Sequence, residues 1–430
     1  MTLPGIPQGA RRLAMGRKSL LPLLGLLVLG GLPAQGGESP APPQAQKWIA
    51  LRRALHKNPE LANRETQTMR RVASYLSELG LPDVRTEIAK TGVVATIKGG
   101  RPGPTVALRA PMDAFPIQEK RDAPTRSRKA GVSHACGHDA MMAITLGAAE
   151  LLWARRKDLA GDVRLLFQPA EEGPPEGEEG GAPLMIKEGA LEGVSAIVTL
   201  HVDSDIPAGS AGLHPGAVYA GSDTLQVRVE GASAHAATPW KGVDAIAVAG
   251  QILSGLQMVA SRQTGIWSPV VLTVGTIQAG TRSNALAGEA RLTGTLRSYS
   301  AESRSRARES ISRIVRHVAQ AFGARAEISF SEEIPPTVND ARLLKHLRPT
   351  LEQALGPEKL RILEPLPFAD DFSLMAERVP SFYFQLGVKN EKEGITAGTH
   401  TESFDVDESA IPLGARLLAE LAAKALAFNP

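Results

Sequence analysis

The chain has 430 residues, of which 43% are hydrophobic and 22% are charged, a balance that is typical of a globular protein and excludes wholesale disorder. This length exceeds what one hydrophobic core usually supports, so we expect two domains. Four of the 48 Lys and Arg residues lie in the first 34 residues, which contain no acid, and the remaining chain is nearly neutral. That balance predicts no basic surface for nucleic acid or for a membrane.

Residues 1–34 have the pattern of an export signal. A basic stretch is followed by 13 mostly apolar residues, LLPLLGLLVLGGL at 20–32, and by small residues that suit a signal peptidase. The apolar run is shorter than the ~20 residues that span a bilayer as a helix. We therefore predict a signal peptide, export to the periplasm or the medium, and no stable membrane span after its removal. An uncleaved anchor is the alternative.

The next part of the chain alternates between strand and helix patterns. The Pro- and Gly-rich segment 35–46 is predicted to be a disordered lead-in, and 48–80 has helical periodicity that ends at a glycine. Apolar runs typical of buried strands follow at 105–110, 162–168 and 195–202. A helix is predicted at 140–156. This alternation predicts a largely parallel sheet covered by helices.

The pattern changes near Tyr219. From there to residue 332 the predicted elements follow the order β-α-β-β-α-β, which is typical of a small ferredoxin-like domain. The α/β pattern then resumes and continues to the C-terminus. We therefore predict an α/β protein in which a larger domain, made of 47–218 and 333–430, carries a smaller domain of 219–332 as an insertion.

The only cysteine, Cys136, lies two residues before His138 in the sequence SHACGHDAMM. One cysteine cannot form a disulfide within the chain, although exported proteins often contain disulfides. A lone cysteine is most often a small buried side chain, whereas a metal-bound thiolate needs further ligands from elsewhere in the chain. Positions i and i+2 do not share a helix face, so the two side chains can meet at one ion only in a loop or at a helix start.

Polar residues also follow the predicted strands. Asp113 follows the first strand, the pair Glu171 and Glu172 follows the second, and His201 lies at the end of the third. Open α/β sheets place their sites beyond the carboxyl ends of parallel strands. Zinc accepts Cys, His and carboxylate ligands together. Of two adjacent glutamates, one can bind the metal while the other acts as a general base on a water molecule.

Eight sequence motifs occur in the order of a known family, from about residue 48 to the C-terminus. They are LHKNPEL…ET, LRAPMDAFPIQE, HACGHDA, FQPAEEG, LHV, GASAHAATPWKGVDAI, VGTIQAGTRSNAL and DDFSLM…VP…FYFQLG. In this combination the chain resembles the aminoacylase-like amidohydrolases, subfamily D of metallopeptidase family 20, which includes hippurate hydrolases and auxin-conjugate hydrolases. The resemblance implies a catalytic α/β domain of the di-zinc-peptidase type with an inserted ferredoxin-like lid or dimerisation domain.

The resemblance also implies a role for each matching residue. Two divalent cations would be held by Cys136, His138, Glu172, His201 and His400. Glu171 would be the general base and acid, and Asp113 would orient a metal-binding histidine. In the inserted domain, His235 would stabilise the oxyanion, often across a dimer. Asn284 and Arg297 would hold the amide and the carboxylate of the substrate.

Simpler alternatives stay open for some of these residues. His400 lies in a Gly- and Thr-rich stretch and could be structural. His235 and Asn284 could cap turns, and Arg297 could be an ordinary side chain on a strand face. The identity of the metal is open as well: thiolate together with imidazole favours Zn²⁺, and Mn²⁺, Co²⁺ or Ni²⁺ are the alternatives.

The chain departs from the usual family sequence at Pro111, Met141, Phe368 and Asp370. These residues stand where relatives commonly have an acid, a histidine, a glycine and a glutamate, and none of them is a predicted ligand. We expect Met141 and Phe368 to make the substrate pocket more apolar.

Together these features predict an exported metal-dependent amidohydrolase that cleaves the amide bond of N-acyl amino acids or related small amides and peptides. Its partner would be a small-molecule substrate and not a nucleic acid, and the resemblance implies a homodimer formed through the inserted domain. A dipeptidase or carboxypeptidase on the same scaffold is the first alternative. A binding protein that kept the fold and lost turnover is the second.

Overall fold

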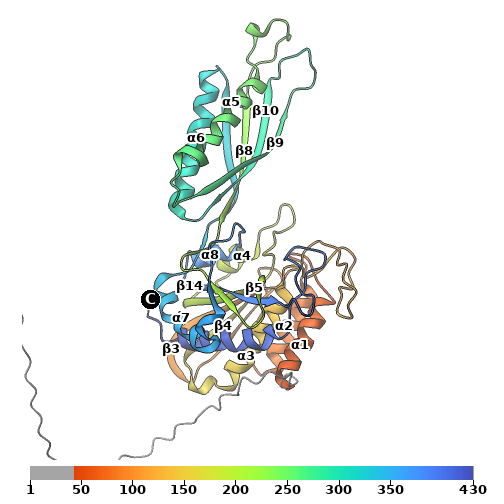
Figure 1. Ribbon diagram of the computed structural model, residues 1–430, viewed down its shortest axis with the longest axis vertical. Helices are drawn as coiled ribbons and strands as arrows, with labels where there is room; N and C mark the ends of the chain where they lie inside the picture. Colours follow the sequence, from red (N-terminus) through yellow and green to blue (C-terminus); the bar gives the residue numbers. More distant parts are fainter. Residues whose placement is uncertain (1–42, 430) are drawn as a thin grey trace, which may run out of the picture. The chain divides into compact units, whose positions relative to one another are not determined.

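A computed structural model describes residues 43–429 (Figure 1). The predicted signal peptide at 1–34 and residues 35–42 of the predicted lead-in lie outside this part. Helix α1 (Pro43–His56) begins inside the lead-in, so the last residues of that segment are helical and not disordered. Among the described residues, no helix combines the length and the apolar character needed to cross a membrane.

A mixed eight-stranded sheet organises the larger domain, in the order β1-β2-β4-β3-β5-β14-β6-β13. Its strands are β1 (Val84–Ile88), β2 (Gly92–Ile97), β3 (Arg101–Pro111), β4 (Ala160–Gln168), β5 (Val194–Pro207), β6 (Ala211–Leu213), β13 (Leu360–Ile362) and β14 (Ser381–Lys389). The neighbours β4, β3, β5 and β14 are parallel, and the antiparallel pairs lie toward the two edges. The prediction of a largely parallel sheet is confirmed for its centre, where the carboxyl ends of four strands meet at one edge.

Helices cover both faces of this sheet (Figure 1). One layer contains α1, α2 (Thr66–Glu78), α3 (His138–Ala154), α7 (Ala341–Leu355) and α9 (Ala410–Ala425), and the other contains α4 (Gly181–Lys187) and α8 (Phe372–Ala376). Strand side chains alternate between the layers: in β3, Val106 and Leu108 pack on the first and Ala107 on the second. Burial on both faces explains why the central strands are almost continuously apolar.

The stretch 48–80, for which helical periodicity was predicted, forms two helices, α1 and α2. Pro59 has no N–H to continue the first helix, and the residue before a proline disfavours helical angles. In the connecting segment, the buried carboxylate of Glu60 accepts the backbone N–H and the hydroxyl of Thr68. Helical periodicity on both sides of the break conceals it in the sequence.

The smaller domain has the predicted order of elements. They are β8 (Gly221–Glu230), α5 (Ala245–Met258), β9 (Val270–Ala279), β10 (Glu289–Ser298), α6 (Ala301–Ala321) and β11 (Arg325–Ile334). The strands form an antiparallel sheet in the order β11-β8-β10-β9, and its apolar side chains pack with Ile252 of α5 and Ile311 of α6. Strand β9 therefore forms one edge of this sheet.

A short antiparallel pair, β7 (Ala217–Tyr219) and β12 (Thr337–Val338), joins the two chain segments that flank the smaller domain. This pair brings together residues that are more than a hundred positions apart, as an insertion requires. The domain boundaries at 219 and 332 remain predictions.

Candidate metal centre

Separate elements of the larger domain carry the predicted ligands and the predicted base. Cys136 and His138 lie at the start of α3, Glu171 and Glu172 follow β4, and His201 belongs to β5. Strand β5 is longer than predicted and continues past His201 beside β14. Three chain segments thus converge near the edge where the parallel strands end.

Gly137 shapes the start of α3. Its φ of +87° lies in the left-handed region, and an added Cβ would come within 2.4 Å of the Val202 side chain. Glycine satisfies both conditions, whereas any other residue would meet strain and a clash. This turn leaves Cys136 just before the helix and His138 at its first position, so the two side chains can approach the same point, as the sequence predicted.

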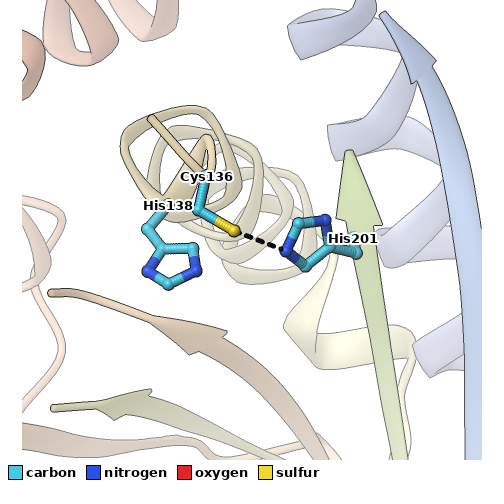
Figure 2. A group of neighbouring side chains, drawn as sticks. All are labelled: Cys136, His138 and His201. Atoms are coloured by element: carbon cyan, nitrogen blue, oxygen red, sulfur yellow. Dashed lines mark hydrogen bonds between the residues drawn. The ribbon is translucent and has the colours of Figure 1, made fainter. Parts of the chain in front are cut away.

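Cys136 belongs to two groups of potential ligand atoms. In the first group it lies with His138 and His201, and its sulfur is 3.4 Å from His201 Nε2 (Figure 2). In the second it lies with Glu172 and His400, whose Nε2 is 3.0 Å from Glu172 Oε1. Within each group all ligand atoms lie within 4.8 Å of one another. A thiolate shared by two such groups suits a pair of neighbouring cations.

Asp113 holds His138 in one orientation. His138 Nδ1 is 2.8 Å from the backbone oxygen of Asp113 and 3.3 Å from its carboxylate, so the ring hydrogen belongs on Nδ1. The other nitrogen, Nε2, is buried without a hydrogen-bond partner among residues 43–429, at 3.6 Å from Glu171 and 3.9 Å from Glu172. A buried nitrogen lone pair costs free energy unless it is bound. A cation at this point would bind it.

The centre gathers acidic groups in a buried setting. Burial raises the pKa of Glu171 well above its usual value, and the Asp370 and Glu172 carboxylates raise it further. Burial also raises the pKa of the Cys136 thiol, and the same glutamates add to the effect. For Glu172, burial opposes ionisation, but the hydrogen bond with His400 lowers its pKa. Divalent cations would offset this excess of negative charge, and the donor set of thiolate, imidazole and carboxylate fits zinc.

A buried ion pair beside Glu171 was missed in the sequence. The guanidinium of Arg109 binds the carboxylate of Asp370 at 2.9 and 3.2 Å, and the Tyr383 hydroxyl donates to the same carboxylate at 3.0 Å. Carboxylate oxygens of Asp370, Asp371 and Glu171 lie within 4.8 Å of one another. An arginine inside the apolar stretch TVALRA was a signal for a buried acidic partner, but it does not say which acid.

The departures from the family sequence have different surroundings. Asp370 forms the ion pair with Arg109. Met141 is fully buried in the core of the first helix layer, where it packs with other apolar side chains. Phe368 has 59% of its surface exposed. Of the two residues that were expected to line a pocket, Phe368 alone is therefore accessible.

Of the three candidate residues of the inserted domain, His235 belongs to none of the groups of ligand atoms found among the described residues. His235 and Asn284 are exposed and adjacent, because Ala236 N–H donates to the backbone oxygen of Asn284 at 3.1 Å. Arg297 is half-buried in β10, and its side chain forms no hydrogen bond or ion pair within residues 43–429. The structure thus brings His235 and Asn284 together and leaves Arg297 unpaired.

Known proteins match the chain over most of its length. Residues 107–424 match Peptidase family M20/M25/M40. The chain is 37% identical to thermostable carboxypeptidase 2 of Saccharolobus solfataricus, over 89% of this chain and 96% of that protein. It is 36% identical to N-acetylcysteine deacetylase of Bacillus subtilis, over 87% and 96%. A crystal structure of a dinuclear metal-binding peptidase of the M20 family from Bacillus subtilis has a TM-score of 0.77 and 34% identity, covering 89% of this chain and 98% of that one.

Proposed function

The chain belongs to Peptidase family M20/M25/M40, and we propose that it removes the acyl group from N-acyl amino acids. The family assignment confirms the resemblance seen in the motifs, and the solved relative confirms the fold class. The protein is accordingly a metal-dependent hydrolase of amide bonds. The observation that carries the proposal is Cys136, whose sulfur is shared by two groups of ligand atoms next to the buried carboxylate of Glu171.

The site fits two divalent cations, and the Bacillus subtilis relative is described as dinuclear. The residues that would hold them are Cys136, His138, Glu172, His201 and His400. When bound, such cations polarise an amide carbonyl and lower the pKa of water from 15.7 toward ~7. Zn²⁺ suits the donor set, and Mn²⁺, Co²⁺ and Ni²⁺ are the alternatives that a metal assay would separate.

Glu171 is suited to the proton transfers of the reaction. It belongs to neither ligand group that contains Cys136, and its carboxylate lies instead in a group with Asp113 and His138, next to the proposed cations. Burial and the neighbouring Asp370 raise its pKa, which strengthens it as a base. Glu171 would accept a proton from water and then give it to the leaving amine. The positive charge of Arg109 partly offsets the negative charge of Asp370 beside Glu171.

The inserted domain would contribute the contacts to the substrate. The unpaired guanidinium of Arg297 would bind the carboxylate of the amino acid through two parallel hydrogen bonds. Asn284 would bind the amide, and the imidazole of His235 would stabilise the developing oxyanion. The adjacency of His235 and Asn284 supports a joint role, since both would act on the same amide group.

A substrate panel tests this proposal. The purified protein is supplied with Zn²⁺ or Mn²⁺ and assayed against N-acetyl, N-benzoyl and longer N-acyl amino acids, together with their amidated forms that lack the carboxylate. We expect hydrolysis of the free acids and much slower hydrolysis of the amidated forms. Equal rates on the two sets would contradict the role of Arg297, and no hydrolysis of any blocked amino acid would contradict the proposed substrate class.

A carboxypeptidase or dipeptidase is the second candidate function, because a carboxypeptidase is among the relatives. Both substrate classes end in a carboxylate that Arg297 could bind, but dipeptides also carry a free amino group. Dipeptides and their N-acetylated forms are therefore compared in the same assay. Release of the C-terminal amino acid would favour the peptidase, and release of acetate from the N-acetylated forms would favour the deacylase.

We further propose a homodimer formed through the inserted domain. Within residues 43–429, strand β9 pairs only with β10, so its outer edge is open. Val271 and Ile277 on β9 and Ile246 and Met258 on α5 are each about half exposed. An open edge flanked by apolar side chains favours pairing with the same strand of a second copy. Light scattering should show a dimer for the natural protein and a monomer for Ile277→Lys, and an unchanged mass for the variant would contradict this interface.

Export is proposed from the sequence of residues 1–34 alone. The basic start, the short apolar run and the small residues that follow support it. N-terminal sequencing of the protein recovered from cells tests the proposal: we expect a new N-terminus close to residue 34 and the protein outside the cytoplasm. An intact N-terminus on cytoplasmic protein would contradict it.

A further inference from the structure

We propose that Phe115 is a positioning residue that holds the imidazole of His400 in its metal-binding orientation. The two rings are stacked, with centroids 4.2 Å apart and planes inclined by 20°. The inference rests on the proposed function, because it concerns a ligand of the proposed cations. The motifs assign Phe115 no role.

His400 needs external support more than the other predicted ligands do. It lies in the irregular segment between β14 and α9, its φ is +58°, and 44% of its side chain is exposed. A left-handed conformation is sparsely populated for residues other than glycine and persists where the surroundings enforce it. His138, by contrast, is buried in α3 and fixed through Asp113.

The backbone anchors both rings to one short segment. Phe115 and Ser133 exchange two hydrogen bonds, of 2.9 and 3.1 Å. The N–H of His400 donates to the backbone oxygen of Ala135 at 2.8 Å. The segment that leads into Cys136 therefore holds Phe115 and His400 within stacking distance of each other. Through His400, the ligand group of Cys136, Glu172 and His400 is fixed to this same segment.

The stack restricts rotation of the His400 ring. The phenyl ring of Phe115 contacts one face of the imidazole and leaves the edge of the imidazole free. His400 Nε2 lies on this edge, 3.0 Å from Glu172 Oε1. The stack with Phe115 thus fixes the plane of the His400 imidazole, while the contact with Glu172 fixes the direction in which Nε2 points. Partners that orient metal ligands typically contribute about 10- to 100-fold to metal affinity. The other ligand group, of Cys136, His138 and His201, does not include His400.

The test compares Phe115→Leu, which keeps an apolar side chain without a ring face, with Phe115→Tyr, which keeps the stack. Each full-length protein is stripped with a chelator, titrated with Zn²⁺ by calorimetry, and analysed for zinc per chain. We expect two ions in the natural protein and in Phe115→Tyr. In Phe115→Leu we expect one ion to bind normally and the other at least about 10-fold more weakly.

A double-mutant cycle separates positioning from a general structural effect. If Phe115 acts through His400, Phe115→Leu should have no further effect on zinc binding in a His400→Ala background. Loss of both ions together, or the same loss with His400 absent, would overturn the inference. So would normal binding of both ions by Phe115→Leu. If that variant unfolds, Phe115→Met takes its place in the same cycle.

The outcome for the natural protein distinguishes this inference from the proposed function. Two ions in the natural protein and two equally tight ions in the Leu variant would overturn the role of Phe115 and leave the metal centre intact. Fewer than two ions in the natural protein would overturn the two-cation centre, and the inference would fall with it.

Discussion

The metal centre and the candidate substrate residues of the inserted domain differ in how much the fold holds them. In the larger domain, the backbone oxygen of Asp113 accepts the Nδ1–H of His138 at 2.8 Å and its carboxylate accepts the N–H of Glu172 at 2.9 Å, so one residue fixes two neighbours. In the inserted domain, His235 is exposed and the Arg297 side chain has no partner within residues 43–429. The fold preorganises the first set. In the second set, His235 Nδ1 accepts the N–H of Ala237 at 3.1 Å, and the remaining partners would come from a substrate. Changes in the first set should therefore affect metal binding, proton transfer or stability, and changes in the second should affect substrate binding and turnover without loss of metal.

The largest effect is expected from Glu171→Gln. It should lower kcat by at least about 100-fold, because the amide cannot act as a base, and both ions should stay bound. Glu172→Gln should instead weaken metal binding, since Glu172 lies with Cys136 and His400. Turnover and zinc per chain are measured for both. The exposed Glu176 provides the matched control, and Glu176→Gln should leave turnover unchanged. Substantial turnover by Glu171→Gln would refute its assignment.

Cys136→Ser should weaken the binding of both ions, because the sulfur belongs to both ligand groups. His201→Ala should weaken one ion, because His201 belongs to one group that contains Cys136. Zinc titration of the stripped proteins distinguishes the two patterns. If Cys136→Ser bound one ion as tightly as the natural protein does, the sulfur would not be shared.

Arg297→Ala probes the inserted domain. A lost hydrogen-bonded contact to a charged group should raise KM by about 10- to 100-fold, consistent with the 1.5–3 kcal/mol typical of such bonds. The melting temperature and the zinc content should not change, because the side chain forms no hydrogen bond or ion pair with residues 43–429. Arg291→Ala on the same strand is the control, since Arg291 pairs with Glu289. A fall in stability for Arg297→Ala would show that the residue is structural.

Glu65→Leu tests whether the buried carboxylate of Glu65 holds the turn before Glu171 in place. The buried carboxylate of Glu65 accepts the N–H of Ala170 at 2.9 Å and the hydroxyl of Thr91 at 2.5 Å. Leaving these donors unpaired should lower the free energy of unfolding by about 1–3 kcal/mol. Turnover should fall as well, because Ala170, with φ of +49°, directly precedes Glu171. Urea unfolding of this variant and of Glu65→Gln measures the effect, and equal stability of Glu65→Leu and the natural protein would exclude it.

The smallest effect concerns acid sensitivity. Although burial opposes ionisation of Glu119, its hydrogen bonds with His56 and with the Ser127 N–H lower its pKa from 4.5 to about 2. Because the folded-state pKa is depressed, Glu119 stabilises the fold above pH ~4.5, and this contribution is lost as the pH falls toward 2. Glu119→Gln should therefore melt lower than the natural protein at pH 7, with a smaller difference at pH 3. A difference that is the same at both pH values would contradict the charge-based role.

The sequence predicted those parts of the protein that depend on neighbouring residues. The i, i+2 spacing of Cys136 and His138 placed this pair in a loop or at a helix start, and local periodicity predicted the four strands and two long helices of the inserted domain. Contacts between distant segments were not predictable in the same way. The ion pair of Arg109 and Asp370 joins positions 261 residues apart, and no local pattern selects that acid from the others.

The break between α1 and α2 shows a second limit. Pro59 is visible in the sequence, but helical periodicity on both sides conceals the break. The stack of Phe115 on His400 shows a third, because it depends on how two loops meet against the segment before Cys136. Backbone pairing of this kind leaves no periodic pattern in either loop.

Anomalous diffraction from a crystal grown with Zn²⁺ tests the shared thiolate most directly. We expect two anomalous peaks, both within bonding distance of the Cys136 sulfur, which is about 2.3 Å for zinc. One should have His201 among its ligands and the other His400. A single peak, or two peaks that are not both within bonding distance of the Cys136 sulfur, would contradict the shared thiolate.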